Sequence, residues 1–238
     1  MIGKIKKIIK KILFPKYHNN DAYISFLRNG GAQIGERTFF YDIMSHPVDE
    51  TSLPFISIGS DCRITAGAYI LGHDYSYAVL RKTHHRMLCK TVGTSIGNNV
   101  FLGMRSIIMP GTTIGNNVIV AAGAVVTGFV PDNVVVAGNP ARILCTLDEY
   151  YTKLNEKFEN YAVTAYKKKK SYLGRELTEK DMGWYNQLWE YEGKQEVYDL
   201  LRVDGDDKKE VIDDVMRIEP KYGSFNEFKE ANKLERFD

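Results

Sequence analysis

Aliphatic residues recur at every sixth position between residues 96 and 126, and this period is the main structural signal in the chain. The period matches neither the alternation of a half-buried strand nor the 3.6-residue repeat of an amphipathic helix. A short fixed period predicts a solenoid, in which each turn buries its aliphatic residues against the next turn. The residues that open successive six-residue blocks are Ile96, Leu102, Ile108, Ile114, Val120 and Val126.

The same pattern predicts how one turn of the solenoid is built. Three blocks of six residues make one three-sided coil, with the opening residue pointing inward and the fifth, small or β-branched, near a corner. Glycine and asparagine suit the tight corners, because Gly adopts positive φ freely and Asn tolerates it better than most residues. The pattern also occurs at residues 34–39, 58–63 and 64–69, so we expect the solenoid domain to span residues 34–145.

Two segments interrupt the six-residue phase. Residues 45–55 contain two prolines, and residues 73–95 contain aromatic and basic residues without any repeat. A loop ejected from a regular stack has no structural task in that stack, and functional sites are often built from such loops. The sequence therefore predicts that the longer loop, 73–95, borders a functional site.

The N-terminal segment, residues 1–33, is expected to be helical at its start. In residues 1–14 isoleucines share one helical face and lysines occupy the rest, and Pro15 ends the pattern. A basic amphipathic helix of this kind can lie on an anionic membrane surface. The alternative is that the isoleucines pack against the solenoid or a neighbouring subunit, and the sequence does not decide between the two.

Residues 146–238 are expected to form a C-terminal helical appendage. Apolar residues have helical spacing over residues 147–170, and capping boxes begin at Thr178 and Ser224. No motif in this region indicates a function.

Composition narrows the classes of function. The formal net charge of +2 gives no support for a nucleic-acid partner. The three cysteines lack the spacing of metal ligands, and Cys62 stands at the fifth position of its block, where a small buried residue is expected. No apolar stretch approaches the length of a membrane span, so we expect a cytoplasmic protein, with peripheral contact to the inner face of the membrane through residues 1–14 as an option.

The run from Ile96 to Ile143 resembles the hexapeptide-repeat acyltransferases, and most of all the branch that contains the maltose, galactoside and xenobiotic O-acetyltransferases. The resemblance covers about residues 34 to 145, roughly half of the chain. It implies a mainly-β fold, the left-handed parallel β-helix, which is an exception to the usual right-handed crossover. It also implies a homotrimer that uses acetyl-coenzyme A, and no metal.

Acetyl transfer to a hydroxyl needs a general base, and histidine suits this task because its ordinary pKa is close to neutral. His73 directly follows the last block before the long loop, and the resemblance places the catalytic histidine there. His46 is the rival, because its His-Pro context also resembles that around the family's base, although it stands one coil earlier. Asp74 is not expected to orient His73, since adjacent residues seldom join their side chains; a backbone carbonyl could do so.

The resemblance also implies a slot for the coenzyme. It places two residues along the pantetheine arm, two at the thioester end and two near the nucleotide, where an arginine suits phosphate. These residues are, in that order, Gly103 and Met104, Ala122 and Gly123, and Thr127 and Arg142. Two positions that are often basic in the family are Gly128 and Cys145 here, so other lysines, such as Lys153 or the run 167–170, could contribute instead.

The sequence says less about the acceptor. Tyr41 and Asp42 stand where the sugar O-acetyltransferases have a hydrogen-bonding Asn, and His84 and His85 lie in the middle of the long loop. These four are the candidate acceptor-binding residues. Asp49, with the following glutamate, could also reach sugar hydroxyls.

We therefore expect an acetyl-coenzyme A-dependent O-acetyltransferase that acts on a carbohydrate acceptor, a sugar hydroxyl of a capsule or O-antigen polysaccharide. The first alternatives are a xenobiotic acetyltransferase and an amino-sugar N-acetyltransferase. A different class is a metal-binding β-helix like the γ-class carbonic anhydrases. The scattered histidines do not show the ligand spacing that this class needs.

Overall fold

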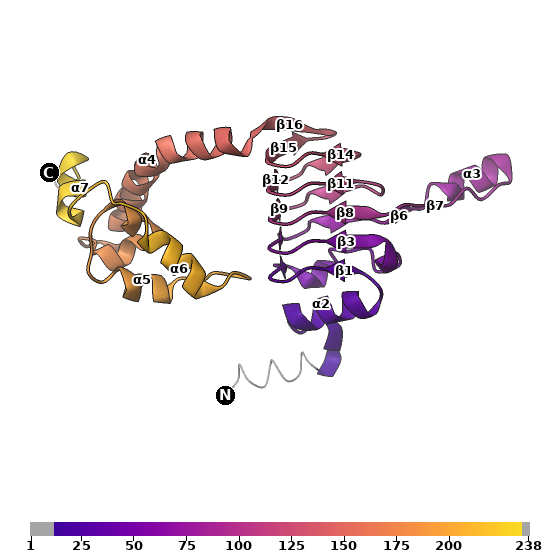
Figure 1. The fold of residues 1–238 in the computed structure, drawn as a ribbon, viewed down its shortest axis with the longest axis horizontal. Helices are drawn as coiled ribbons and strands as arrows, with labels where there is room; N and C mark the ends of the chain where they lie inside the picture. Colours follow the sequence, from indigo (N-terminus) through magenta and orange to yellow (C-terminus); the bar gives the residue numbers. More distant parts are fainter. Residues whose placement is uncertain (1–11, 235–238) are drawn as a thin grey trace. The chain divides into compact units, whose positions relative to one another are not determined.

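Short parallel strands stack into three sheets between Gln33 and Thr146 in the computed structural model, which describes residues 12–234 (Figure 1). The first sheet contains β1 (Gln33–Ile34), β3 (Ile56–Ile58), β8 (Thr94–Ile96), β11 (Thr113–Ile114) and β14 (Phe129–Val130). The second contains β2 (Phe39–Phe40), β4 (Arg63–Ile64), β9 (Val100–Leu102), β12 (Val118–Val120), β15 (Val134–Gly138) and β16 (Ala141–Thr146). The third contains β5 (Tyr69–Ile70), β10 (Ile107–Ile108) and β13 (Val125–Val126).

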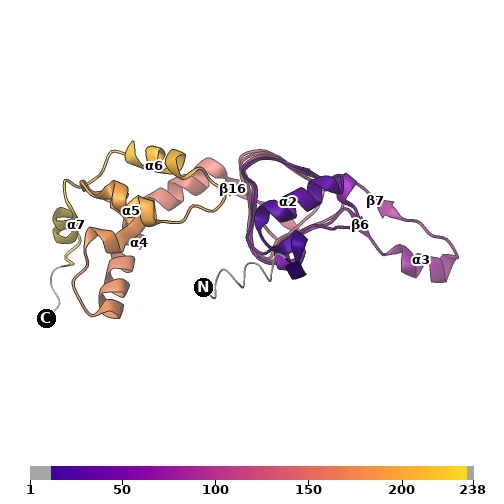
Figure 2. The same ribbon diagram turned by 90° about the horizontal axis from the view of Figure 1, so that it is seen from below.

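From β3 to β15 the strands of the stack belong to the three sheets in turn, so each circuit of the chain forms one three-sided coil; in the first coil the third side is the single bridge of Val48 to Ile70. Ile96 pairs with Ile114 and Leu102 with Val120, partners that are eighteen residues apart. Eighteen residues are three blocks of six, as the sequence pattern predicts. Figure 2 looks along the stack, and the coils superpose in that view.

The inside of the stack is filled by the residues that open the blocks. Ile108, Leu102 and Val120 have no exposed surface, and Ile64 and Ile70 are equally enclosed. The fifth positions are buried as well and are small, as at Cys62, which is a free thiol. Each coil therefore buries its aliphatic row on the next coil, and the stack needs no second layer.

The tightness of this core leads to a stability prediction. We expect Leu102→Ala to lower the free energy of unfolding by about 3 kcal/mol, because the neighbouring coils cannot collapse into the space that the side chain leaves. The matched control is Leu144→Ala in the same compact unit, residues 1–150, where the leucine is 69% exposed. Urea denaturation of both variants measures the difference, and equal losses would contradict the core assignment.

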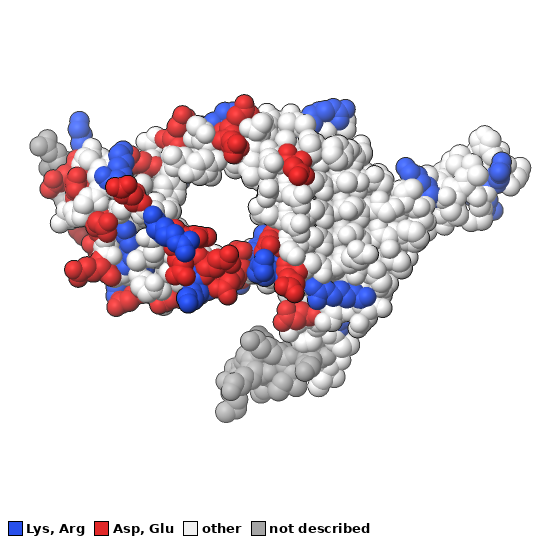
Figure 3. All heavy atoms as spheres, viewed as in Figure 1, with Lys and Arg blue, Asp and Glu red and all other residues white. Residues whose placement is uncertain are grey.

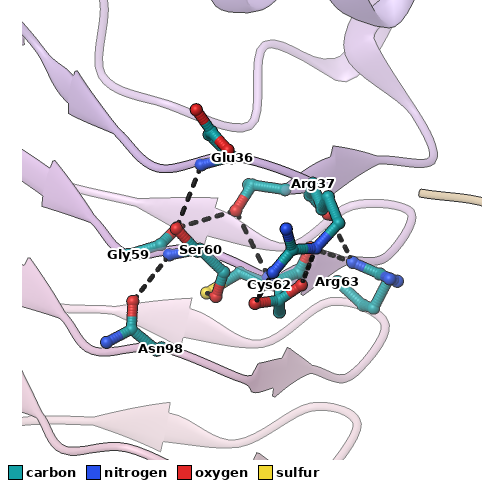
Figure 4. A network of polar contacts seen from close by, with 9 residues as sticks. Glu36, Arg37, Gly59, Ser60, Cys62, Arg63 and Asn98 are labelled. Carbon is teal, nitrogen blue, oxygen red and sulfur yellow. Dashed lines mark hydrogen bonds and ion pairs between the residues drawn. The ribbon is translucent and has the colours of Figure 1, made fainter. Parts of the chain in front are cut away.

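The corners between the first and second sheets carry a ladder of polar contacts. The side chain of Asn98 accepts a hydrogen bond from the amide of Ser60 at 2.8 Å, and Asn116 accepts from the amide of Asn98 at 2.9 Å. Figure 4 shows the start of this ladder, where the Ser60 hydroxyl accepts from the Glu36 amide. Asn99 and Asn117 adopt left-handed backbone with φ of 53° and 55°, which explains the preference for asparagine here.

The stack begins under a helix and ends in an antiparallel strand. Helix α2 (Asn20–Asn29), which follows the short turn η1 (Pro15–Tyr17), buries Tyr23 and Leu27 in the core that it shares with the first coil. The sequence pattern did not predict α2. At the other end β16 runs antiparallel to β15. Of the helix predicted over residues 1–14, residues 1–11 lie outside the described part, and Ile12 and Leu13 are exposed.

The second predicted interruption leaves the stack where expected, but the first does so only in part, because Val48 is buried and pairs with Ile70 as the third side of the first coil. The first contains the short turns η2 (Ile43–Ser45) and η3 (Leu53–Phe55). The second contains β6 (His73–Asp74), helix α3 (Tyr77–His84) and β7 (Lys90–Thr91). Strands β6 and β7 pair antiparallel and carry α3 away from the stack (Figure 1). We call residues 73–91 the arm.

The second compact unit, residues 151–238, is helical as far as it is described. Its elements are the end of α4 (Leu147–Leu173), η4 (Glu179–Leu188), α5 (Lys194–Leu200), α6 (Lys208–Met216) and α7 (Phe225–Ala231). Trp189 and Phe228 are fully buried in its aromatic core. The capping box at Thr178 is present with Asp181 as its partner, and Ser224 caps α7. Within residues 12–234 no helix has the length and hydropathy of a membrane span.

Candidate active site

His73 stands at the point where the chain leaves the stack. Two residues separate it from the end of β5, and it begins β6. Its side chain is 16% exposed. Its Nδ1 atom lies 2.5 Å from Oδ2 of Asp49 and 2.9 Å from Oγ of Ser52. Because an ionised carboxylate only accepts hydrogen bonds, Nδ1 donates to Asp49 and the lone pair is left on Nε2. His73 is therefore held in the tautomer that a general base needs.

Asp49 is itself fixed by its surroundings. Its Oδ2 accepts from the amide of Gly72 at 3.2 Å, and its Oδ1 accepts from the hydroxyl of Thr51 at 2.7 Å. Burial alone would raise the pKa of the Asp49 carboxyl, but hydrogen bonds from Thr51 and His73 outweigh burial and hold the pKa below its ordinary value. The carboxylate is thus ionised over the physiological range and orients the imidazole.

The role of Asp49 was missed in the sequence, which suggested only a contact with sugar hydroxyls. A usable signal exists in the coil length. Ile34 pairs with Ile58, 24 residues later, and Asp49 and His73 have the same separation. This offset brings Asp49 close to His73, but it is approximate, because on the third side of the coil Val48 pairs with Ile70, 22 residues later. A search among sequence neighbours finds only Asp74.

A pocket of about 530 Å³ opens beside this pair. The ring of Tyr75 contacts the ring of His73 edge-on, with 4.6 Å between the ring centroids. Tyr69, which precedes the histidine in the sequence, also lines the pocket. The lining of the pocket includes carboxylates and no Lys or Arg. The residues that line it are His46, Val48, Asp49, Glu50, Thr51, Tyr69, Leu71, His73, Asp74 and Tyr75. Aromatic faces with carboxylates suit the ring and hydroxyls of a sugar.

His46, the rival base, lines the same pocket but belongs to a different network. Its Nδ1 atom lies 2.8 Å from the hydroxyl of Tyr17 and 3.3 Å from Oε1 of Glu50. Burial would raise the pKa of Glu50, but hydrogen bonds from Lys16 and Tyr17 outweigh it and lower the pKa. The same carboxylate forms an ion pair with Lys16 at 2.7 Å. His46 thus shares Glu50 with two other partners, while Asp49 has His73 as its only histidine partner in the described chain.

Four of the six predicted coenzyme residues stack at one corner between the second and third sheets. The amide of Gly123 donates to the carbonyl of Met104 at 2.8 Å, which joins neighbouring coils. A Cβ atom on Gly103 would lie 2.5 Å from the amide nitrogen of Ala122, so only glycine permits this close stacking. Met104, Ala122 and Gly123 are exposed, and the outer side of Gly123 is open. The corner forms a small-residue strip on the surface.

The other two predicted coenzyme residues lie apart from this strip. Arg142 is exposed on β16, opposite Ala137 of β15, and donates to the Ala141 carbonyl at 2.8 Å. Since β15 stacks on β12, Arg142 lies toward the same end of the second sheet as Ala122. Thr127 follows β13 directly and lies at the opposite end of the strands of the third sheet.

A single chain does not bring His73 and Ala122 together. Ala122 precedes β13, whereas His73 follows β5, and these parallel strands belong to the same sheet. The two residues therefore lie at opposite ends of the strands of the third sheet, that is, at two different corners of the coil. Thr127 lies at the same corner of the coil as His73, and the strip that contains Ala122 lies at the other corner.

The four predicted acceptor residues do not line the pocket beside His73. Tyr41 is exposed and packs on Phe39 at 5.0 Å, and Asp42 precedes η2. His84 ends α3 and His85 reverses the chain beyond it with a φ of 52°. In the described chain the side chains beside His73 are instead those of the pocket. The described residues also contain no group of three or more His, Cys, Asp or Glu arranged to hold a metal ion.

Comparisons with known proteins agree with this architecture. The bacterial transferase hexapeptide family, described as six repeats, matches residues 93–128. Protein CapG of Staphylococcus aureus is 38% identical over 170 residues, which cover 68% of this chain and 94% of that protein. The chain therefore belongs to the hexapeptide-repeat acyltransferases.

Two further proteins are similar over a smaller share of the chain. The putative lipopolysaccharide biosynthesis O-acetyl transferase WbbJ of Escherichia coli K12 is 33% identical over 163 residues, covering 61% of this chain and 83% of that protein. Among solved structures, a maltose O-acetyltransferase from Clostridium difficile 630 has 32% identity and a TM-score of 0.41, and the match covers 49% of this chain and 59% of that one.

Proposed function

We propose that this protein transfers acetyl from acetyl-coenzyme A to a hydroxyl of a sugar, with His73 as the general base. The observation that carries the proposal is the pair of His73 and Asp49 at the wall of a pocket where the coil is interrupted. Acyl transfer to a hydroxyl needs a base in this tautomer, held within reach of a bound alcohol. The coil is left-handed in this proposal, as in the family that the sequence resembles.

The chemistry assigned to the chain has two proton transfers. Acetyl-coenzyme A supplies an activated acetyl group as a thioester. Nε2 of His73 takes the proton of the acceptor hydroxyl while the oxygen of that hydroxyl attacks the acetyl carbonyl carbon. Asp49 stabilises the imidazolium that forms. The amide of Ala122 or its neighbour at the corner stabilises the negative charge on the carbonyl oxygen. His73 then returns the proton to the leaving sulfur, which gives the O-acetyl sugar and the free thiol.

The strip around Gly103 and Gly123 suits a pantetheine arm, because the backbone at Ala122 and Gly123 is exposed and open, and the exposed Met104 side chain beside it provides an apolar contact. The exposed guanidinium of Arg142, at the same end of the second sheet, suits a phosphate. Both observations support acetyl-coenzyme A as the donor.

The proposal requires more than one chain in the working enzyme. His73 and the strip lie at opposite ends of the strands of the third sheet, so within one chain the base faces away from the donor. A ring of identical subunits solves this, because one corner of each subunit then meets the other corner of the next. We propose the homotrimer, with each site formed by His73 of one subunit and the strip of its neighbour.

A sugar is the favoured acceptor because of the pocket beside His73. Tyr69 and Tyr75 provide faces for a ring, and Glu50 provides an acceptor for its hydroxyls. The similarity to an O-acetyl transferase named for lipopolysaccharide biosynthesis supports a cell-surface polysaccharide or its precursor as the destination.

The test is a thiol-release assay with acetyl-coenzyme A and three classes of acceptor: glycosides, amino sugars and chloramphenicol. We expect thiol release with glycosides that exceeds the rate without acceptor, and an O-acetyl ester in the product by mass spectrometry. Turnover only with chloramphenicol, or an N-acetyl product with amino sugars, would overturn the assignment of the acceptor. Binding of acetyl-coenzyme A without any turnover would overturn the role of His73.

A further inference from the structure

The arm that leaves the stack at His73 carries only positive charge beyond its first strand. Residues 75–90 contain Arg81, Lys82, Arg86 and Lys90 and no Asp or Glu. Every side chain from residue 81 to residue 90 is exposed, and α3 has no buried residue. In Figure 3 the visible face of the arm shows blue and no red.

Arg81, Lys82 and Arg86 have no acidic partner among the described residues of the chain, while Lys90 faces the carboxylate of Asp74 across β6 and β7. None of the four forms an ion pair there, whereas Arg37 pairs with Asp61 at 2.6 Å elsewhere in the same half. A cluster of uncompensated cations on a projecting element raises the local concentration of anions. The arm is therefore suited to hold an anionic group from outside the chain.

The arm and the pocket form one continuous surface. Tyr75 belongs to the arm and also lines the pocket. Lys90 lies directly opposite Asp74, another lining residue, in the ribbon of β6 and β7. Residues paired in this way have Cα atoms about 5 Å apart. A ligand that fills the pocket and extends from it by a few bonds meets Lys90 first.

The pocket itself has the opposite character. It is lined by Asp49, Glu50 and Asp74 and by no Lys or Arg. Glu50 is paired with Lys16 outside the lining, and the other two carboxylates still disfavour an anionic group near His73. A neutral sugar fits there. The two surfaces together select a molecule that is neutral at one end and anionic at the other.

We propose that the acceptor is a glycosyl phosphate or diphosphate, in which a neutral sugar occupies the pocket and the phosphate lies on the arm. The proposal rests on the function proposed above and names its substrate class. Arginine and lysine are suited to this ligand because guanidinium binds phosphate through two hydrogen bonds and lysine supplies a mobile positive charge. The phosphate ester is unchanged by the reaction, since the acetyl group goes to a hydroxyl of the sugar.

The experiment compares two acceptors with the same sugar, its methyl glycoside and its 1-phosphate, in wild type and in the triple variant Lys82→Gln, Arg86→Gln, Lys90→Gln. In wild type we expect a lower KM for the 1-phosphate. In the variant we expect this KM to rise about tenfold, since three exposed charges each contribute modestly, while kcat and the KM for the methyl glycoside change less than about twofold. The matched control is Lys157→Gln, Lys209→Gln, Lys233→Gln, which removes the same charge from the helical unit and is expected to leave both KM values unchanged.

Each other outcome overturns the proposal in a recognisable way. A rise in the KM for acetyl-coenzyme A, with the KM for the 1-phosphate unchanged, would assign the arm to the donor. Loss of binding to vesicles that contain phosphatidylglycerol, with both KM values unchanged, would assign it to a membrane surface. If neither form of any sugar is acetylated, the proposed function fails, and this proposal with it; if both forms are acetylated equally well by all variants, only the arm's role fails.

Discussion

Replacing His73 by alanine is expected to lower kcat about 10³-fold, because a positioned general base contributes about 10²- to 10⁴-fold. The KM for acetyl-coenzyme A is expected to change little, since the donor strip does not include His73. The fold should survive, because the imidazole is at the surface of the stack and outside its aliphatic core. Thiol release measures the rate, and circular dichroism checks the fold.

The control for this prediction is His46→Ala, which removes the other histidine of the same pocket. We expect kcat to fall less than about tenfold, since Nδ1 of His46 shares Glu50 with Lys16 and Tyr17. The assignment of the base would be wrong if the His46 variant lost activity by orders of magnitude and the His73 variant did not.

The second large effect is expected from Asp49→Asn, which we predict to lower kcat about 10²-fold or more. The amide can donate to Nδ1 of His73, and the proton then resides on Nε2, where it blocks general-base catalysis. Asn has nearly the same volume as Asp, so the loss of kcat comes from the missing charge and the changed tautomer of His73 and not from packing. The matched control is Asp61→Asn, a half-buried carboxylate that pairs with Arg37 outside the pocket and is expected to leave kcat within about twofold.

Asp49→Asn also has a consequence for stability that depends on pH. The folded-state pKa of Asp49 is depressed, so its contribution is fully present above the unfolded pKa, near 4, and is lost as pH falls through the folded pKa. The difference in urea midpoint between wild type and variant should therefore be largest near neutral pH and shrink below pH 4. A difference that stays constant from pH 3 to pH 7 would mean that the carboxylate is not held ionised by its partners.

The repeat could be predicted from the sequence because the period has a single structural solution. Aliphatic residues six positions apart can all be buried only if the chain turns three times per coil, and Ile96, Leu102 and Ile108 are enclosed in this way. The asparagine corners follow from the same logic, since Asn99 and Asn117 need positive φ. The point where the arm leaves the stack was also predicted, because a break in the phase is visible without any tertiary information.

The remaining features depend on contacts between distant parts of the chain. Helix α2 was not predicted because its apolar residues Tyr23, Ile24 and Leu27 form only a short stripe, which the first coil completes. Helix α3 buries nothing, so no periodicity marks it. The partnership of Asp49 with His73 crosses from one coil to the next and is not encoded in local spacing.

The central claim is that His73 of one subunit and the strip of its neighbour form one site. The most direct measurement is a crystal structure of the protein with coenzyme A. The account predicts a trimer in which the sulfur lies within about 4 Å of Nε2 of His73, a distance that proton transfer requires, with the pantetheine along Gly103 and Ala122 of the adjacent subunit. A sulfur bound far from every His73 imidazole, or a coenzyme held entirely by one isolated chain, would contradict it.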